Sequence, residues 1–174
     1  MGRLRVRCVS VPEGGLAAGS FPSIDYADAY AVAIPPSVQA RELAEALFTT
    51  VPPWLSALMR LRNALVAPLG LVATRSALER VATAASGTGE RIGIFPVLAE
   101  AQDEVLLGLD DRHLDFRVSV RVLEDASGRL GIFATLVRFH GALGRVYFVP
   151  VKPAHQLIVP AMLRRGVGLL EARG

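Results

Sequence analysis

The sequence predicts an α+β fold: a curved antiparallel sheet with helices on one face and a long C-terminal helix. From residue 91 onward, apolar residues recur with a period of two over four consecutive segments, which is typical of strands. Before and after that block they recur at helical spacing. Helices segregated from a run of adjacent antiparallel strands are typical of α+β proteins.

The strongest strand signal is the alternation in His113–Leu123. Over its first ten residues the apolar side chains all fall on one face, which predicts a strand that is buried on one side only. A turn at residues 125–128 joins it to a second strand, Arg129–His140. The apolar face comprises Leu114, Phe116, Val118, Val120 and Val122.

Two further strands, Ile92–Ala99 and Glu104–Leu109, complete a predicted meander of four, with Pro96 at a bulge or an edge position. At the other end of the chain, Arg3–Val11 alternates arginines with apolar residues and predicts a strand with Leu4, Val6 and Cys8 directed inward. Its row of arginines suits the edge of a sheet.

The helical segments are less regular. Asp25–Val32 fits either a short helix or an extended segment. Helical spacing predicts helices over Ser37–Thr49, over residues 52–70 and over Ser76–Ala84. The last predicted helix is Pro153–Ala172, with a kink at Pro160 or, alternatively, two helices meeting there.

Composition narrows the class of protein. The 174 residues, 52% hydrophobic and 20% charged, predict one folded domain spanning 1–174. The net charge is +3, and the arginines are dispersed without an aromatic-flanked basic cluster, so we expect no nucleic-acid partner. No apolar run is long enough to span a membrane.

The cellular compartment is predicted from the single cysteine and the N-terminal residues. Cys8 alone supports no disulfide framework, and its strand pattern predicts an inert core thiol. Residues 1–12 lack the apolar core of a signal peptide. We therefore expect a cytoplasmic protein.

Several motifs of the C-terminal half carry a family resemblance. They are Asp-Arg-His-Leu-Asp-Phe-Arg at 111–117, Arg-Phe-His at 138–140, Leu-Gly-Arg-Val-Tyr-Phe at 143–148 and Lys-Pro-Ala-His at 152–155. Together with Pro53–Trp54 and Leu61–Asn63, they resemble an uncharacterised bacterial family. Its domain occurs alone or fused behind an NAD(P)-binding short-chain-dehydrogenase-like domain. Gly141 stands where the family tends to have Asn, and Ala154 where it tends to have an aromatic residue.

The order of elements also resembles the helix-grip architecture of START-like domains, in which a sheet curls around a terminal helix. That resemblance implies a cavity between the sheet and the helix, and with it a small apolar or amphipathic ligand. The residues expected to line such a cavity are Trp54, Leu58, Phe116, His140, Tyr147 and Leu157. No Gly-x-Gly-x-x-Gly follows a strand, so we infer no redox cofactor.

The weak catalytic candidates are His113, Asp115, Arg117 and His140. An acid–base pair would set Asp115 beside His113, whereas the alternative is a charge ladder of Asp115 and Arg117 with Arg138 or Arg145 across the sheet. The three histidines have no short metal-ligand spacing, so we predict no metal site. His155 is expected to cap or bond locally at the start of the last helix.

Three functions therefore stay open. The leading hypothesis is ligand binding between the sheet and the C-terminal helix. The second is a non-catalytic accessory domain that docks a dehydrogenase-like partner or forms a homodimer. The third is an enzyme of hydrolase or cyclase type, which would need one of the histidines to face a cavity.

Overall fold

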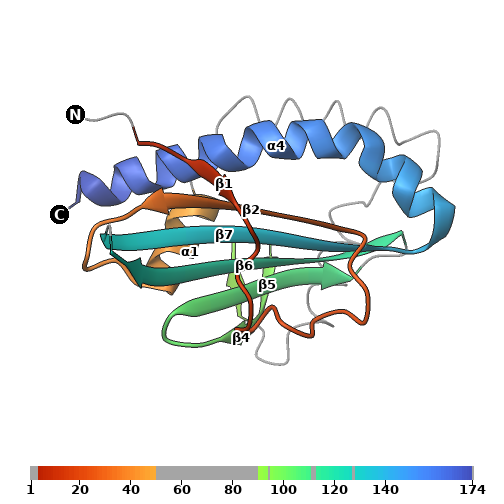
Figure 1. The fold of residues 1–174 in the computed structure, drawn as a ribbon, viewed down its shortest axis with the longest axis horizontal. Helices are drawn as coiled ribbons and strands as arrows, with labels where there is room; N and C mark the ends of the chain where they lie inside the picture. The colour runs from red at the N-terminus through yellow and green to blue at the C-terminus, as the bar shows by residue number, and fades with distance from the viewer. Residues whose placement is uncertain (1–3, 50–89, 94, 111–112, 127, 174) are drawn as a thin grey trace.

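The computed structural model describes residues 4–49, 90–93, 95–110, 113–126 and 128–173. The strands form an antiparallel seven-stranded sheet in the order β1-β2-β7-β6-β5-β4-β3 (Figure 1). The described elements are β1 (Arg7–Val9), β2 (Tyr26–Ala33), α1 (Ala40–Thr49), β3 (Arg91–Ile92), β4 (Phe95–Glu100), β5 (Glu104–Asp110), β6 (Leu114–Asp125), β7 (Gly128–Phe139) and α4 (Gly141–Glu171). This confirms the predicted α+β class with a long C-terminal helix.

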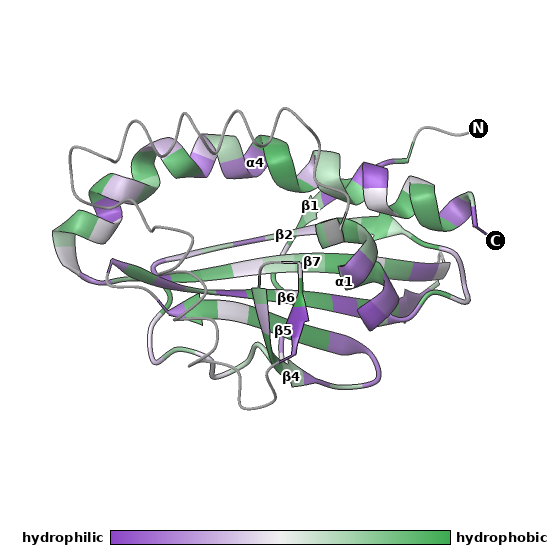
Figure 2. Cartoon of the chain, turned by 180° about the vertical axis from the view of Figure 1, so that it is seen from behind, coloured by the Kyte–Doolittle hydropathy of each residue, from purple (hydrophilic) through white to green (hydrophobic). Residues whose placement is uncertain are grey.

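One face of the sheet, which we call the inner face, packs against α1 and α4 and holds the main core. The predicted apolar face of β6 lies here, with Val118, Val120 and Val122 at most 5% exposed. The C-terminal half of α4 approaches α1 closely, because a Cβ atom at Gly166 would stand 2.8 Å from the Leu47 side chain. Bands of hydrophobic residues follow the strands and α4 in Figure 2.

The opposite, outer face is not left open to solvent, so the prediction that β6 is buried on one side only is wrong. Ala17 and Phe21, from the segment between β1 and β2, pack on Leu106 and Leu136. The buried carboxylate of Glu104 holds this segment. It accepts hydrogen bonds from the backbone N–H groups of Leu16 (2.7 Å) and Ala17 (3.2 Å).

β1 forms the edge of the sheet, as its arginines predict, and Leu4 and Val6 pack against the main core. Cys8, by contrast, is exposed, so the expectation of a core thiol is wrong. The strand spans three residues and is the last in the order of described strands, where it pairs with β2. The segment that fits either a helix or an extended chain is the eight-residue strand β2.

The largest difference between the predicted and the observed elements is in α4. The helix begins at Gly141, not Pro153, and is therefore twelve residues longer at its N-terminal end than predicted. Gly144 allows the first turn of α4 to approach the residue directly before β6, because a Cβ atom at Gly144 would lie 2.1 Å from the His113 carbonyl oxygen. The helix runs unbroken through Pro160, so the alternative of two helices is wrong.

The predicted strand Ile92–Ala99 is two strands, β3 and β4, which pair with each other through Ile92 and Phe95. The ladder between β4 and β5 shifts register between Val97 and Ala99, just after Pro96. The helices predicted over residues 52–70 and Ser76–Ala84 lie outside the described residues. Neither of the described helices is long and apolar enough to cross a membrane.

Candidate functional site

A polar network stands on the otherwise apolar inner face, where α4 passes over β2 and β7. Its centre is Asp28 on β2, whose side chain is 9% exposed. Asp28 Oδ2 accepts a hydrogen bond from the Tyr26 hydroxyl at 2.6 Å, and Asp28 Oδ1 lies 3.1 Å from His155 Nε2 of α4. Thr135 Oγ1 of β7 lies 3.3 Å from the same nitrogen. Three elements therefore meet at one carboxylate.

The sheet register explains why these side chains converge. Asp28 pairs with Thr135 across the β2–β7 ladder, so both project from the same face. Tyr26 is two residues before Asp28 on the same strand and shares that face. His155 reaches them from α4, where it lies fourteen residues past the start of the helix at Gly141 and not at its beginning. The expected local capping role of His155 is therefore wrong.

Hydrogen bonding sets the charge of this network. Burial by itself would raise the pKa of Asp28, but hydrogen bonds from His155 and Tyr26 outweigh it and lower that pKa. Burial and the adjacent Asp28 carboxylate raise the pKa of the Tyr26 hydroxyl above its usual range. The same two causes raise the pKa of Tyr30 to about 12. The site thus holds one anionic carboxylate beside protonated tyrosines at neutral pH.

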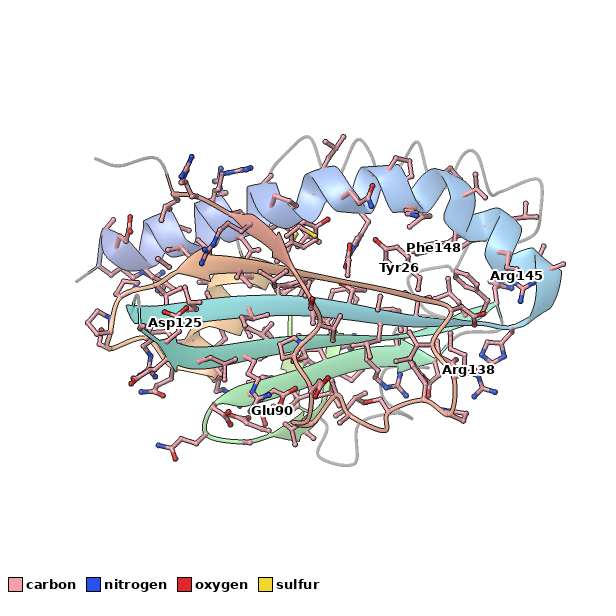
Figure 3. All side chains as sticks on the ribbon, viewed as in Figure 1. Tyr26, Glu90, Asp125, Arg138, Arg145 and Phe148 are labelled. Atoms are coloured by element: carbon pink, nitrogen blue, oxygen red, sulfur yellow. The ribbon has the colours of Figure 1, made fainter. Side chains whose placement is uncertain are left out.

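Aromatic rings flank the network on the side of the β7–α4 connection. The Tyr26 ring packs on Phe148 of α4 at a centroid distance of 4.7 Å (Figure 3). Its edge contacts the His155 ring, and Lys152 Nζ stands 5.4 Å from the Tyr26 ring centroid. Phe148 in turn contacts Phe139. These contacts fix the direction of the Tyr26 hydroxyl toward Asp28.

A row of half-buried phenylalanines crosses the inner face away from Asp28. Phe116 of β6 contacts Phe95 of β4 at 5.4 Å, and Phe95 contacts Phe48 of α1 at 5.2 Å. The register aligns Tyr26, Val137 and Phe116 in one line across three strands. At about 4.8 Å per strand, Phe116 stands about 10 Å from the tyrosine. An apolar row and a polar network therefore share one end of the inner face.

The network does not have the geometry of a nucleophilic triad. A hydroxyl nucleophile and an orienting carboxylate must bond opposite nitrogens of the histidine. Here Thr135 and Asp28 both approach Nε2 of His155. The network instead provides an anionic acceptor, the Asp28 carboxylate, together with hydroxyl groups. These groups can recognise a hydrogen-bond donor.

The four catalytic candidates lie around the outer face, at the end where β7 leads into α4. Asp115 pairs with His140, with Nε2 and Oδ2 2.8 Å apart, rather than with His113. The His113 ring instead faces Tyr147 at 6.4 Å. Arg117 forms an ion pair with Asp110 and lies over the Phe21 ring. The structure thus brings Asp115 and His140 together and places Arg117 in a separate pair.

The predicted ligand-binding residues are scattered. Phe116 belongs to the phenylalanine row of the inner face, whereas Leu157 is 73% exposed on α4. His140 and Tyr147 lie at the β7–α4 connection. Trp54 and Leu58 lie outside the described residues.

Sequence reasoning missed Tyr26, Asp28 and Thr135. One signal was present: two polar side chains, two residues apart, interrupt the apolar alternation of residues 26–32. That signal identifies a shared face only once the segment is known to be a strand.

Elsewhere the inner face of the described part of the chain offers no comparable cluster of buried polar groups. A shallow polar hollow of about 210 Å³ lies at the far end of the sheet, lined by Gln39, Gln102, Asp103, Val122, Glu124 and Arg129. Among the described residues, no group of three or more His, Cys, Asp or Glu side chains could hold a metal ion. The polar network is therefore the candidate site.

Comparison with known proteins agrees with the resemblance seen in the sequence. A search of curated proteins and a search of solved structures each gave no match. The model of one family, described as a protein of unknown function (DUF2867), matches residues 20–162. That range includes every residue of the polar network, and it covers most of the chain. The protein therefore belongs to the DUF2867 family of proteins of unknown function.

Proposed function

We propose that the protein binds a small amphipathic molecule on the inner face of its sheet, with the polar group of that molecule at Asp28. The observation that carries this proposal is a charged, nearly buried carboxylate within an apolar helix–sheet interface. A START-like ligand cavity between the sheet and the C-terminal helix is the corresponding architecture.

The chemistry of the ligand follows from the groups around it. Its apolar body packs against Phe116 and Phe95, whose rings are half-buried. Its polar group is a hydrogen-bond donor, because Asp28 is anionic and would repel a carboxylate or phosphate. The distance of about 10 Å between Phe116 and Tyr26, whose hydroxyl bonds Asp28, suits a flat molecule of two or three fused rings.

Two matched probes test this function: 2-naphthol, which carries a hydroxyl donor, and 2-methoxynaphthalene, which does not. Fluorescence titration should show that the protein binds 2-naphthol about tenfold more tightly, the value of one hydrogen bond to a charged group. Asp28→Asn should remove that preference, and Phe116→Leu should weaken the binding of both probes.

Leu157→Ser is the matched control, because Leu157 is 73% exposed and should not affect the binding of either probe. The absence of binding of both probes would contradict the proposed site. An undiminished preference for 2-naphthol in the Asp28→Asn variant would contradict the role of the carboxylate.

The exposed apolar side chains of α4 favour a second candidate function, a non-catalytic interaction domain. Val149 and Leu157 are each 73% exposed, and Val146 is 57% exposed. A contiguous apolar surface of this kind marks an interaction site more often than a solvated face. Light scattering on the full chain, with and without Val149→Ser and Leu157→Ser, tests whether this surface drives self-association.

A further inference from the structure

The outward face of α4 combines an apolar stripe with charges of one sign. Exposed residues recur at helical spacing from Leu143 onward, and the stripe that they form contains Leu143, Val146, Val149, Pro150, Pro153 and Leu157. At 100° per residue these positions fall within one third of the helix circumference. A helix face directed to water is ordinarily polar, so this exposed apolar stripe suits contact with a partner.

The charges of α4 indicate what kind of partner that is. Between Gly141 and Leu170 the helix carries Arg145, Lys152, Arg164 and Arg165 and no acidic residue. Arg145 is 72% exposed and lies 3.8 Å from Asp25, and Lys152 is exposed beside the Tyr26 ring. In the helical projection Arg145 and Lys152 lie along one side of the stripe, Arg165 lies along the other, and Arg164 falls in line with its centre. Figure 3 shows Arg145 at the β7 end of α4.

From these two observations we infer that the outward face of α4 binds an anionic lipid surface. The inference rests on the second candidate function, an interaction domain, and specifies its partner. Apolar side chains enter the headgroup boundary while flanking lysines and arginines reach the phosphates, as in helices that lie in the plane of a membrane surface. Each basic side chain near such a surface strengthens binding about fivefold.

The alternative partners fit this surface less well. A second copy would bring two sets of like charges together, because α4 has no acidic residue before Glu171 to compensate them. Interfaces between proteins are enriched in aromatic anchors. The stripe has only aliphatic residues and prolines.

Vesicle co-sedimentation of the full chain tests the inference. The protein should sediment with vesicles of phosphatidylcholine and phosphatidylglycerol but not with vesicles of phosphatidylcholine alone, and added salt should release it. Lys152→Gln combined with Arg164→Gln should weaken binding by about 25-fold, two steps of about fivefold. Val149→Ser combined with Leu157→Ser should reduce binding at least as strongly.

Ile24→Ser and Arg7→Gln serve as matched controls, because Ile24 is 50% exposed outside α4, and Arg7 is exposed on β1, where it pairs with Ala31 of the outer face. Both controls should retain the binding of the unmodified protein. Failure to sediment with anionic vesicles, or equal sedimentation with neutral ones, would overturn the lipid inference. If light scattering then shows a dimer that the apolar variants dissociate, the interaction function stands with a second copy as partner. If neither is seen, the interaction function fails as well.

Discussion

Two nearly buried carboxylates lie on opposite faces of the sheet and hold different kinds of segment. Glu104, 2% exposed on the outer face, accepts hydrogen bonds from the backbone of the 14–21 segment and from the Ser119 hydroxyl at 2.7 Å. Asp28, on the inner face, bonds within the described part of the chain to side chains, among them Tyr26 and His155. The two networks have the same acceptor chemistry and different donors.

The difference in donors indicates that one carboxylate has a structural role and that the other can exchange its hydrogen-bond donors. Backbone N–H groups cannot rotate to another acceptor, and a buried N–H group without an acceptor lowers the stability of the fold. Glu104 therefore keeps its hydrogen bonds to the segment that it holds. A histidine or threonine side chain can rotate to another rotamer. Another donor can then hydrogen-bond to the carboxylate in its place. Asp28 is therefore the carboxylate suited to a ligand, and Glu104 the one that fixes the fold.

The largest expected effect comes from removing each carboxylate. Glu104→Ala should lower the free energy of unfolding by about 3 kcal/mol, because it leaves two backbone N–H groups and a hydroxyl without an acceptor. Asp28→Ala should cost about 1–2 kcal/mol, because its side-chain donors can find water or new partners. Urea unfolding of both variants at neutral pH measures the difference. Equal losses would contradict the distinction between the two networks.

A smaller effect tests how closely the outer segment fits Glu104. Gly14 and Gly15 both have positive φ, +72° and +77°, so alanine at either position is strained by about 1–2 kcal/mol. A Cβ atom at Gly15 would also lie 2.2 Å from Glu104 Oε2, whereas at Gly14 it would meet nothing within 4 Å. Gly15→Ala should therefore destabilise the protein by about 1 kcal/mol more than Gly14→Ala.

The double variant Gly15→Ala with Glu104→Ala provides the control. Without the carboxylate, the additional cost of Gly15→Ala should disappear, and the two glycine substitutions should then cost the same. A Gly15→Ala penalty that stays larger in the Glu104→Ala background would show that something other than the carboxylate is displaced.

The inner face of the sheet could be predicted from local sequence, and the two networks could not. The alternation in β6 identifies Val118 and Val120 as core residues, because successive side chains of a strand point to opposite faces of the sheet. Glu104 and Leu16 are 88 residues apart, and Asp28 and His155 are 127 residues apart. No local period links partners at those separations, so only the folded topology reveals them.

The start of α4 was missed for the opposite reason, since local propensity argues against the helix that forms. Gly141, Gly144, Pro150 and Pro153 all disfavour helix. Tertiary contacts override them: Phe148, 8% exposed, packs on Tyr26, and the first turn fits closely over the His113 carbonyl only because residue 144 is glycine.

The smallest expected effect is the pH dependence of the Asp28 network. Because hydrogen bonds from His155 and Tyr26 lower the pKa of Asp28 in the folded protein, the unfolded chain binds the proton more readily. This stabilisation is fully present above the unfolded pKa of about 4 and is lost as the pH falls below it. Asp28→Asn should therefore flatten the decline of the free energy of unfolding between neutral and acidic pH.

Urea unfolding of the wild type and Asp28→Asn at a series of pH values measures that slope. Thr135→Val provides an intermediate case, because it removes one hydrogen bond that lowers the pKa of Asp28 while keeping the carboxylate. Its decline should lie between those of the other two proteins. Parallel declines in all three would mean that Asp28 makes no pH-dependent contribution. The hydrogen bonds would then not offset the cost of burying the charged carboxylate by enough to lower its pKa, although it would still be ionised at neutral pH.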